Sequence, residues 1–283
     1  MKTIIKRSYR YYFSHYRCKK MKNLLSRIIK RRIQNSYLFI LCPPYAGSTL
    51  LNELLSTSPN VSANNDLGSR EGQQLPTTRK IMYDHRERWN IDRKYDWIFI
   101  KKEWLKYWDI RRPILLEKSP PNIIRALEIQ AHFKPAYFIC MVRNPYAHCE
   151  GIIRRNNNQP KNAAEFVINC FKYQRKNIEI LENVLMITYE ELTEDTDLVV
   201  DKLTRFIPWL NDINTNLVSK AHNYMKKPMP ISNMNDEKIA RLSKQQMHEL
   251  NSVFEKEKDL LDYFGYEIIC ENHTLPQHVV PAE

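Results

Sequence analysis

The stretch from Tyr37 to Leu55, YLFILCPPYAGSTLLNELL, constrains the fold of this chain more than any other stretch. It opens with a short apolar run rich in aromatic and branched side chains, which is typical of a buried strand. The two prolines that follow cannot continue a sheet ladder, so the strand must end there. Ser48 and Thr49 then open a segment whose leucines share one helical face. We therefore predict a strand, a tight loop and a helix, whose N-terminal backbone N–H groups form a ready anion site.

Three further apolar runs have the length and composition of buried strands, and each precedes a helical pattern. They cover residues 113–118, 136–142 and 184–189. Buried strands that alternate with helices are typical of a doubly wound parallel β-sheet flanked by helices, the α/β class. Ligands of such sheets bind at the carboxyl ends of the strands. Those ends carry the Gly-Ser-Thr loop, Lys118, Arg143 and Tyr189, and this convergence predicts an anionic nucleotide as the ligand.

The segments between and after the strands are predicted to be loops and helices. Residues 62–78 are polar and contain glycine, as loops do. The stretch KKEWLKYW at residues 101–108 is typical of an amphipathic helix that packs against a core. Ser243 and Gln246 form a capping box that opens a long helix ending near Gly265. Residues 226–235 are broken by prolines, and we expect them to fold over a ligand.

Positive charge is concentrated at the N-terminus. Residues 1–35 hold 12 Lys or Arg and no Asp or Glu, so the formal net charge of +12 belongs to them, and the remainder has 32 residues of each sign. We therefore divide the chain into a basic arm (1–35), one domain (36–270) and a short tail (271–283). A specific nucleic-acid binder is not expected, because no basic excess remains outside the arm.

Two interpretations of the basic arm stay open. The arm either docks on the domain through apolar side chains or tethers the protein to an acidic membrane or nucleic acid. We favour docking, and the side chains expected to make the contact are Leu24, Leu25, Ile28 and Ile29.

The sequence predicts a cytoplasmic protein, or one peripheral to a membrane. We find no signal peptide, and the longest apolar runs are too short to cross a bilayer. The six cysteines are scattered without a C-x-x-C pair, which favours a reduced, intracellular chain.

The order and spacing of these motifs resemble the sulfotransferase superfamily over roughly residues 37–268. The matching pieces are P-x-x-G-S-T after the first strand, then L-L-E-K-S-P, V-R-N-P-Y-A, I-T-Y-E-E-L and a C-terminal Y-F-G-Y. The most similar branch is that of the protein-tyrosine sulfotransferases, which lack a Walker A Lys. The resemblance implies a P-loop-like sulfotransferase fold and 3′-phosphoadenosine 5′-phosphosulfate as the sulfate donor.

The resemblance also implies which residues bind the donor. They are the loop for the 5′-phosphosulfate, the Arg of R-N-P, two positions on the next helix, the Tyr of Y-E-x-L and a C-terminal segment that closes over the nucleotide. In this chain these positions are Tyr45, Ala46, Gly47, Ser48, Thr49, Arg143, Gly151, Arg155, Tyr189, Lys227, Ser232, Asn235 and Arg241. Two of them depart from the family pattern, since Tyr45 replaces a basic residue and Gly151 replaces a Ser.

Two catalytic groups follow from the same resemblance. Glu71 matches the base that takes the proton of the acceptor hydroxyl, with Asp66 as the alternative. Lys118 matches the cation that stabilises the leaving phosphate oxygen, and it makes up for the charge missing at Tyr45. Sulfuryl transfer, like phosphoryl transfer, requires mainly in-line positioning and charge stabilisation, so no metal is expected. The acceptor stays open among a protein tyrosine, a carbohydrate and a small phenol.

Two other functions are compatible with the sequence. A kinase-like enzyme on a P-loop scaffold would require Mg²⁺, and the missing Walker A Lys disfavours it. A catalytically degenerate fold, whose basic arm binds membranes or nucleic acid, would explain the departures at Tyr45 and Gly151.

Overall fold

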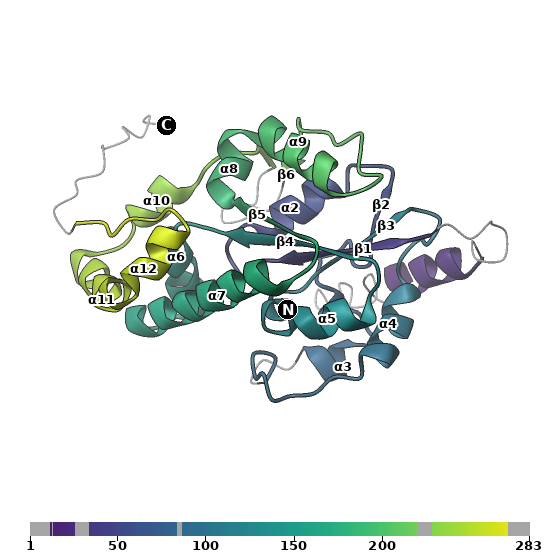
Figure 1. The fold of residues 1–283 in the computed structure, drawn as a ribbon, viewed down its shortest axis with the longest axis horizontal. Helices are drawn as coiled ribbons and strands as arrows, with labels where there is room; N and C mark the ends of the chain where they lie inside the picture. The colour runs from purple at the N-terminus through teal and green to yellow at the C-terminus, as the bar shows by residue number, and fades with distance from the viewer. Residues whose placement is uncertain (1–11, 13, 26–33, 84–86, 220–227, 271–283) are drawn as a thin grey trace, which may run out of the picture.

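The computed structural model describes residues 12, 14–25, 34–83, 87–219 and 228–270. Its centre is a five-stranded parallel sheet with the strand order β2-β3-β1-β4-β5 (Figure 1). The strands are β1 (Ser36–Leu41), β2 (Val61–Ala63), β3 (Ile114–Lys118), β4 (Ala136–Val142) and β5 (Val184–Thr188). The predicted fold class and all four predicted strands are therefore confirmed.

The edge strand β2 is missing from the sequence prediction, which places most of its residues in a loop. It has three residues and pairs only with β3. A run this short shows no period that separates it from a loop. A second sheet, also unpredicted, joins two residues from each of β6 (Val218–Ser219) and β7 (Met229–Pro230).

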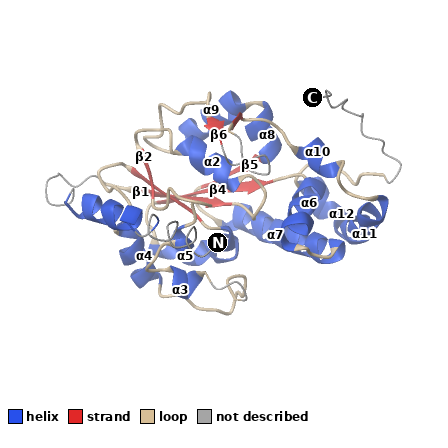
Figure 2. Cartoon of the chain, turned by 180° about the vertical axis from the view of Figure 1, so that it is seen from behind, coloured by secondary structure: helices blue, strands red, loops and turns tan. Residues whose placement is uncertain are grey.

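Helices cover both faces of the sheet (Figures 1 and 2). Successive side chains of a strand point to opposite faces, so Leu38 and Ile40 of β1 belong to one core cluster and Phe39 and Leu41 to another. The first cluster includes residues of α2 (Ser48–Leu55), α8 (Tyr189–Glu194) and α9 (Thr196–Phe206). The second includes residues of α3 (Arg79–Met82), α4 (Trp97–Leu105) and α5 (Ala126–His132).

A third core cluster lies at one end of the sheet. It joins residues of α6 (Pro145–Asn156), α7 (Pro160–Ile180), α10 (Asn235–Ile239), α11 (Lys244–Phe254) and α12 (Lys258–Tyr263). The predicted capping box is present, because the Ser243 side chain accepts from the Gln246 N–H while the Gln246 side chain accepts from the Ser243 N–H. The long helix predicted after it is interrupted by a 3₁₀ turn at Glu255–Glu257. The chain leaves α12 through Gly265, at φ +77°.

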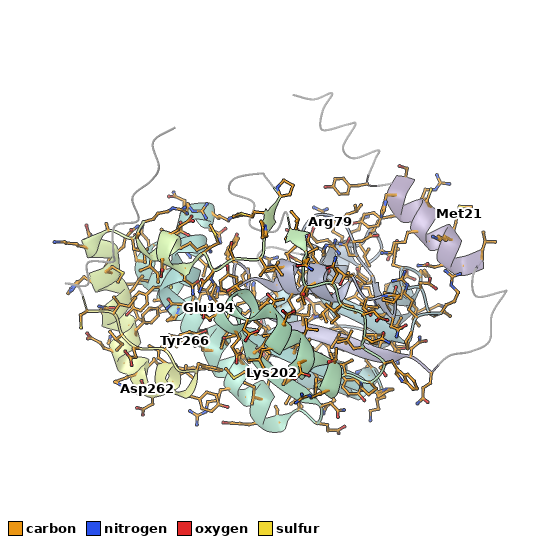
Figure 3. The ribbon with its side chains drawn as sticks, turned by 90° about the horizontal axis from the view of Figure 1, so that it is seen from above. Met21, Arg79, Glu194, Lys202, Asp262 and Tyr266 are labelled. Atoms are coloured by element: carbon orange, nitrogen blue, oxygen red, sulfur yellow. The ribbon has the colours of Figure 1, made fainter. Side chains whose placement is uncertain are left out.

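Part of the basic arm forms a helix at the opposite end of the sheet from α11 (Figures 1 and 3). This arm helix (residues 14–25) inserts Tyr16 into the core beside Tyr107. Leu24 and Leu25 are each 57% exposed, so the prediction that they dock on the domain is wrong. Polar and aromatic contacts made by Tyr16 and Lys19 orient the helix instead. The expected contacts of Ile28 and Ile29 lie outside the described residues.

The described residues contain no helix that is both long enough and apolar enough to cross a membrane.

Candidate functional site

A cavity of about 330 Å³ opens at the carboxyl ends of β1, β3, β4 and β5. Most of the predicted site residues line it, although they come from six separate parts of the chain. They are Tyr45, Gly47, Ser48, Thr49, Glu71, Lys118, Arg143, Arg155, Tyr189 and Arg241. The parallel sheet explains the convergence, because the carboxyl ends of its strands share one edge.

Gly47 brings the loop after β1 against the end of β5. Its φ is +102°, and a Cβ added to it would lie 2.7 Å from the Tyr189 ring. Only glycine satisfies both conditions without strain. Helix α2 starts at the next residue, and the first N–H groups of a helix lack partners within the helix. Gly47 thus lets the start of α2 face the cavity.

Arg143 is a buried cation, 3% exposed, that follows β4. Its Nε donates to Asn235 Oδ1 at 2.8 Å and its Nη1 to the Tyr45 carbonyl at 3.3 Å. Its guanidinium carbon lies 3.8 Å from the Tyr189 ring centroid. Its Nη2 is buried and has no hydrogen-bond partner among the described residues. Burial lowers its pKa, so an anion in the cavity would find a desolvated donor already oriented.

Lys118 and Glu71 face each other across the cavity floor. The Lys118 Nζ lies 3.8 Å from Glu71 Oε1 and 3.4 Å from Thr49 Oγ1, and it also donates to the Ser69 carbonyl. Lys118 is 1% exposed, and burial lowers its pKa. Lys118 therefore lies close both to the Glu71 carboxylate and to the hydroxyl of Thr49, in the first turn of α2.

The Glu71 segment is fixed to the end of β3 by residues of the E-K-S-P motif. The Glu117 carboxylate accepts from the Gly72 N–H at 3.0 Å and from the Ser119 hydroxyl at 2.6 Å. The Ser119 hydroxyl also accepts from the Gln73 N–H at 3.1 Å. Burial raises the pKa of Glu117 to about 7. Sequence reasoning singled out Lys118 in this motif and missed Glu117.

Asp66, the alternative base, does not line this cavity. Its carboxylate lies 3.0 Å from the His15 ring and 3.3 Å from the Lys19 Nζ. Burial alone would raise its pKa, but these two neighbours outweigh burial and hold the pKa below its usual range. A carboxylate held in this way binds protons weakly and is a poor base, so the geometry favours Glu71.

Some predicted donor residues stand behind the cavity wall instead of lining it. Asn235 binds Arg143, and the Ser232 carbonyl accepts from the Tyr189 hydroxyl at 3.2 Å. Ala46 is fully buried. A Cβ added at Gly151 would lie 3.0 Å from the Tyr45 Cβ and 3.3 Å from the Lys238 Nζ, so the space of the family's Ser is already filled. Lys227 lies outside the described residues.

Sequence reasoning missed other residues that line the cavity, among them Tyr83, Arg88, Arg154 and Lys238. Lys238 lies on α10, a five-residue helix with no motif in the sequence. Burial, and after it the charge of Arg143, lower its pKa to about 6. Arg154 is adjacent to the predicted Arg155 in the helix after V-R-N-P, so this basic pair was the sequence signal that could have identified Arg154. Among the described residues, no group of three His, Cys, Asp or Glu could hold a metal ion.

A family model described as "Sulfotransferase family" matches residues 38–209, which is more than half of the chain. The chain belongs to the sulfotransferase family. The match spans the β1 loop, Glu71, Lys118, Arg143 and Tyr189, and it ends before α10. A search of curated proteins gave no match.

Solved sulfotransferase structures share the fold. The "Sulfotransferase Domain from the Curacin Biosynthetic Pathway" aligns with a TM-score of 0.51 at 17% identity, over 84% of this chain and 100% of that one. The "Sulfotransferase Domain from the Synechococcus PCC 7002 Olefin Synthase" aligns with a TM-score of 0.52 at 17% identity, over 85% and 98%. At this identity the likeness concerns the fold.

Proposed function

We propose that this sulfotransferase takes the sulfuryl group from 3′-phosphoadenosine 5′-phosphosulfate and passes it to a hydroxyl acceptor. The observation that carries the proposal is the unused, buried Nη2 of Arg143. It lines the same cavity as the start of α2 and the Lys118–Glu71 pair. The part of the cavity at Arg143 then suits a phosphate, and the part at Lys118 and Glu71 suits the transfer of a sulfuryl group.

Each end of the donor has a set of groups that fits it. The 3′-phosphate is assigned to Arg143, with Arg155 and Lys238 on the same wall. The 5′-phosphosulfate is assigned to the hydroxyls of Ser48 and Thr49 and to the N–H groups that begin α2, where the helix dipole favours an anion. Tyr45 and Lys238 together fill the place that a Ser side chain at residue 151 would need.

Glu71 and Lys118 have separate roles in the proposed reaction. The Glu71 carboxylate takes the proton of the acceptor hydroxyl while the hydroxyl oxygen bonds to sulfur. The bond between sulfur and the bridging phosphate oxygen breaks, and Lys118 stabilises the negative charge that develops on that oxygen. The products are the sulfate ester and 3′-phosphoadenosine 5′-phosphate.

The acceptor is proposed as a hydroxyl of a protein tyrosine, a carbohydrate or a small phenol. Tyr83 and Arg88 line the cavity together with Glu71, and the Arg88 guanidinium carbon lies 5.3 Å from the Tyr83 ring centroid. Aromatic and guanidinium faces suit rings and sugars. Labelled donor offered to members of each class would identify the acceptor by the product that carries the label.

Calorimetry tests the donor assignment. We expect 3′-phosphoadenosine 5′-phosphate to bind without metal and ATP with Mg²⁺ to bind at least tenfold more weakly. Preferential binding of ATP with Mg²⁺ would support a kinase-like enzyme instead. Heat from neither ligand would support a degenerate fold.

We also propose that the arm helix contacts an acidic membrane surface. Met21 lies on the arm helix (Figure 3) and is 60% exposed. Leu24 and Leu25 are exposed as well. Apolar side chains on the outside of a strongly basic segment are typical of interfacial helices, and the absence of acidic residues from residues 1–35 favours anionic lipid.

A further inference from the structure

The arm helix touches the segment that carries Glu71 through a relay of two hydrogen bonds. The Tyr16 hydroxyl donates to Asn65 Oδ1 at 3.1 Å. The amide of Asn65 donates in turn to the Glu71 carbonyl at 2.8 Å. One buried amide therefore connects the arm helix to the backbone of the proposed base.

A second set of contacts holds the start of the same segment. The Lys19 Nζ donates to the Ala63 carbonyl at 2.9 Å and lies 3.3 Å from Asp66 Oδ1. The Lys19 side chain is only 16% exposed. Losing the partner of a largely buried charge is costly, so separating the two sides would leave the Lys19 ammonium without its partners.

The segment itself has little regular structure to define its position. Residues 64–71 lie between the end of β2 and the 3₁₀ turn Gly72–Gln74, and they form neither helix nor strand. On the far side, Glu117 and Ser119 bind the N–H groups of Gly72 and Gln73. Glu71 is thus held between β3 and the arm helix, and its carbonyl accepts from the Asn65 amide and, at 3.0 Å, from the Gln74 N–H. Of these two bonds, the one from Asn65 leads to the arm helix.

We propose that the arm helix is part of the catalytic apparatus, with Tyr16 and Lys19 as positioning residues that hold the Glu71 backbone against β3. The consequence for catalysis rests on the proposed function, whereas the consequence for the mobility of the segment does not. Removing the arm would then remove one of the supports of the Glu71 segment.

The experiment compares Tyr16→Phe and Lys19→Met with Met21→Ala, which alters the exposed face of the same helix. The readouts are hydrogen exchange of residues 63–72, the affinity for 3′-phosphoadenosine 5′-phosphate and, with an acceptor in hand, kcat. Loss of one hydrogen bond corresponds to roughly fivefold. We expect each of the first two variants to speed exchange of residues 63–72 and to lower kcat by about that factor or more. The donor-product affinity should stay within twofold, and Met21→Ala should change nothing.

Tyr16→Phe keeps the buried ring, so it decides the matter even if Lys19→Met does not fold. Unchanged exchange of residues 63–72 in Tyr16→Phe would overturn the proposal. Faster exchange with unchanged kcat would overturn the positioning role in an active enzyme. If the variants exchange faster but the wild-type protein transfers no sulfate, the arm helix would stand as a support of the segment and the proposed function would be rejected.

Discussion

Several cations of the site are buried before any ligand arrives. Arg143 and Lys118 are almost fully buried, and burial lowers the pKa of both and of Lys238. Desolvated like charges oppose folding, and an anion that binds among them removes part of that cost. At the residue scale we therefore expect this site to give up stability in exchange for anion affinity, a trade-off common in functional sites.

The two assigned roles of Glu71 and Arg143 predict opposite kinetic effects. Glu71→Gln removes the base, so we expect kcat to fall about 10²–10⁴-fold with little change in the affinity for 3′-phosphoadenosine 5′-phosphate. Arg143→Ala removes the phosphate donor and should weaken that affinity more than tenfold. Steady-state kinetics and calorimetry on the same preparations separate these effects. Equal losses of affinity in both variants would contradict the assignment.

Lys238 predicts a pH dependence of nucleotide binding. Its pKa of about 6 leaves it mainly neutral in the free protein at pH 7.5. A nearby phosphate favours the protonated form, so the bound state holds more protons and affinity should fall as pH rises above about 6. The slope should approach tenfold per pH unit at most. The charges of Arg143, Arg154 and Arg155 lower the Lys238 pKa, and the charge of Glu150 raises it. Burial, and after it the charge of Lys238, lower the pKa of His148 to about 3.

Lys238→Met provides the control for this pH dependence. The variant should bind more weakly at pH 6.5 and lose most of the slope, leaving only the part that the phosphate's own titration causes. Calorimetry in two buffers of different ionisation enthalpy counts the protons taken up. An unchanged slope in the variant would place the titrating group elsewhere.

At the scale of elements, the unit of β1, loop and α2 depends on one residue. Gly47 lets the chain turn from the strand into the helix while the loop touches Tyr189. The loop carbonyl of Tyr45 binds Arg143, so the same turn also joins β1 to the end of β4. Three strand ends therefore meet at this loop, in which Tyr45 also has a positive φ, of 65°.

Gly47→Ala should destabilise the protein by about 2–4 kcal/mol, because it adds strain from the positive φ to a contact that forces neighbours apart. Gly265→Ala is the matched control, since Gly265 also has a positive φ but has nothing within 4 Å of an added Cβ. It should lose only the strain, about 1–2 kcal/mol. Urea denaturation measures both. Equal losses would show that the contact with Tyr189 is unimportant.

At the scale of the whole molecule, the site and the arm helix are joined through the Glu71 segment. The arm helix lies at one end of the sheet and the cluster of α6, α7, α11 and α12 at the other (Figure 1). The proposed donor-binding groups lie at the carboxyl ends of the strands. Tyr16 and Lys19, which support Glu71, are on the inner face of the arm helix. A partner bound to the outer face of this helix would therefore not touch them directly.

The exposed face of the arm helix predicts binding to anionic vesicles. We expect the protein to sediment with vesicles containing phosphatidylserine at 0.15 M salt and not with neutral phosphatidylcholine vesicles. Leu24→Ser with Leu25→Ser should weaken sedimentation severalfold without altering the melting temperature, since both leucines are exposed. Equal sedimentation with both kinds of vesicle would contradict the proposal.

The sequence by itself determined the strands β1, β3, β4 and β5 and the family, although not the short strands β2, β6 and β7. Continuous apolar runs show buried strands, and the short motifs at their ends show which groups meet at one edge of a parallel sheet. The alternation of strands and helices along the sequence is sufficient to predict which groups meet, because a parallel sheet places the carboxyl ends of its strands at one edge. Ten of the predicted site residues line one cavity for this reason.

Only the tertiary structure decided which groups surround these residues. Lys238 reaches the cavity from a short helix far along the chain, and Glu117 fixes the Glu71 segment from inside the core. The arm helix turns Tyr16 inward and its leucines outward, which is the reverse of what its apolar pattern suggests. Long-range hydrogen bonds and ion pairs set these positions, and they leave no period or spacing in the sequence.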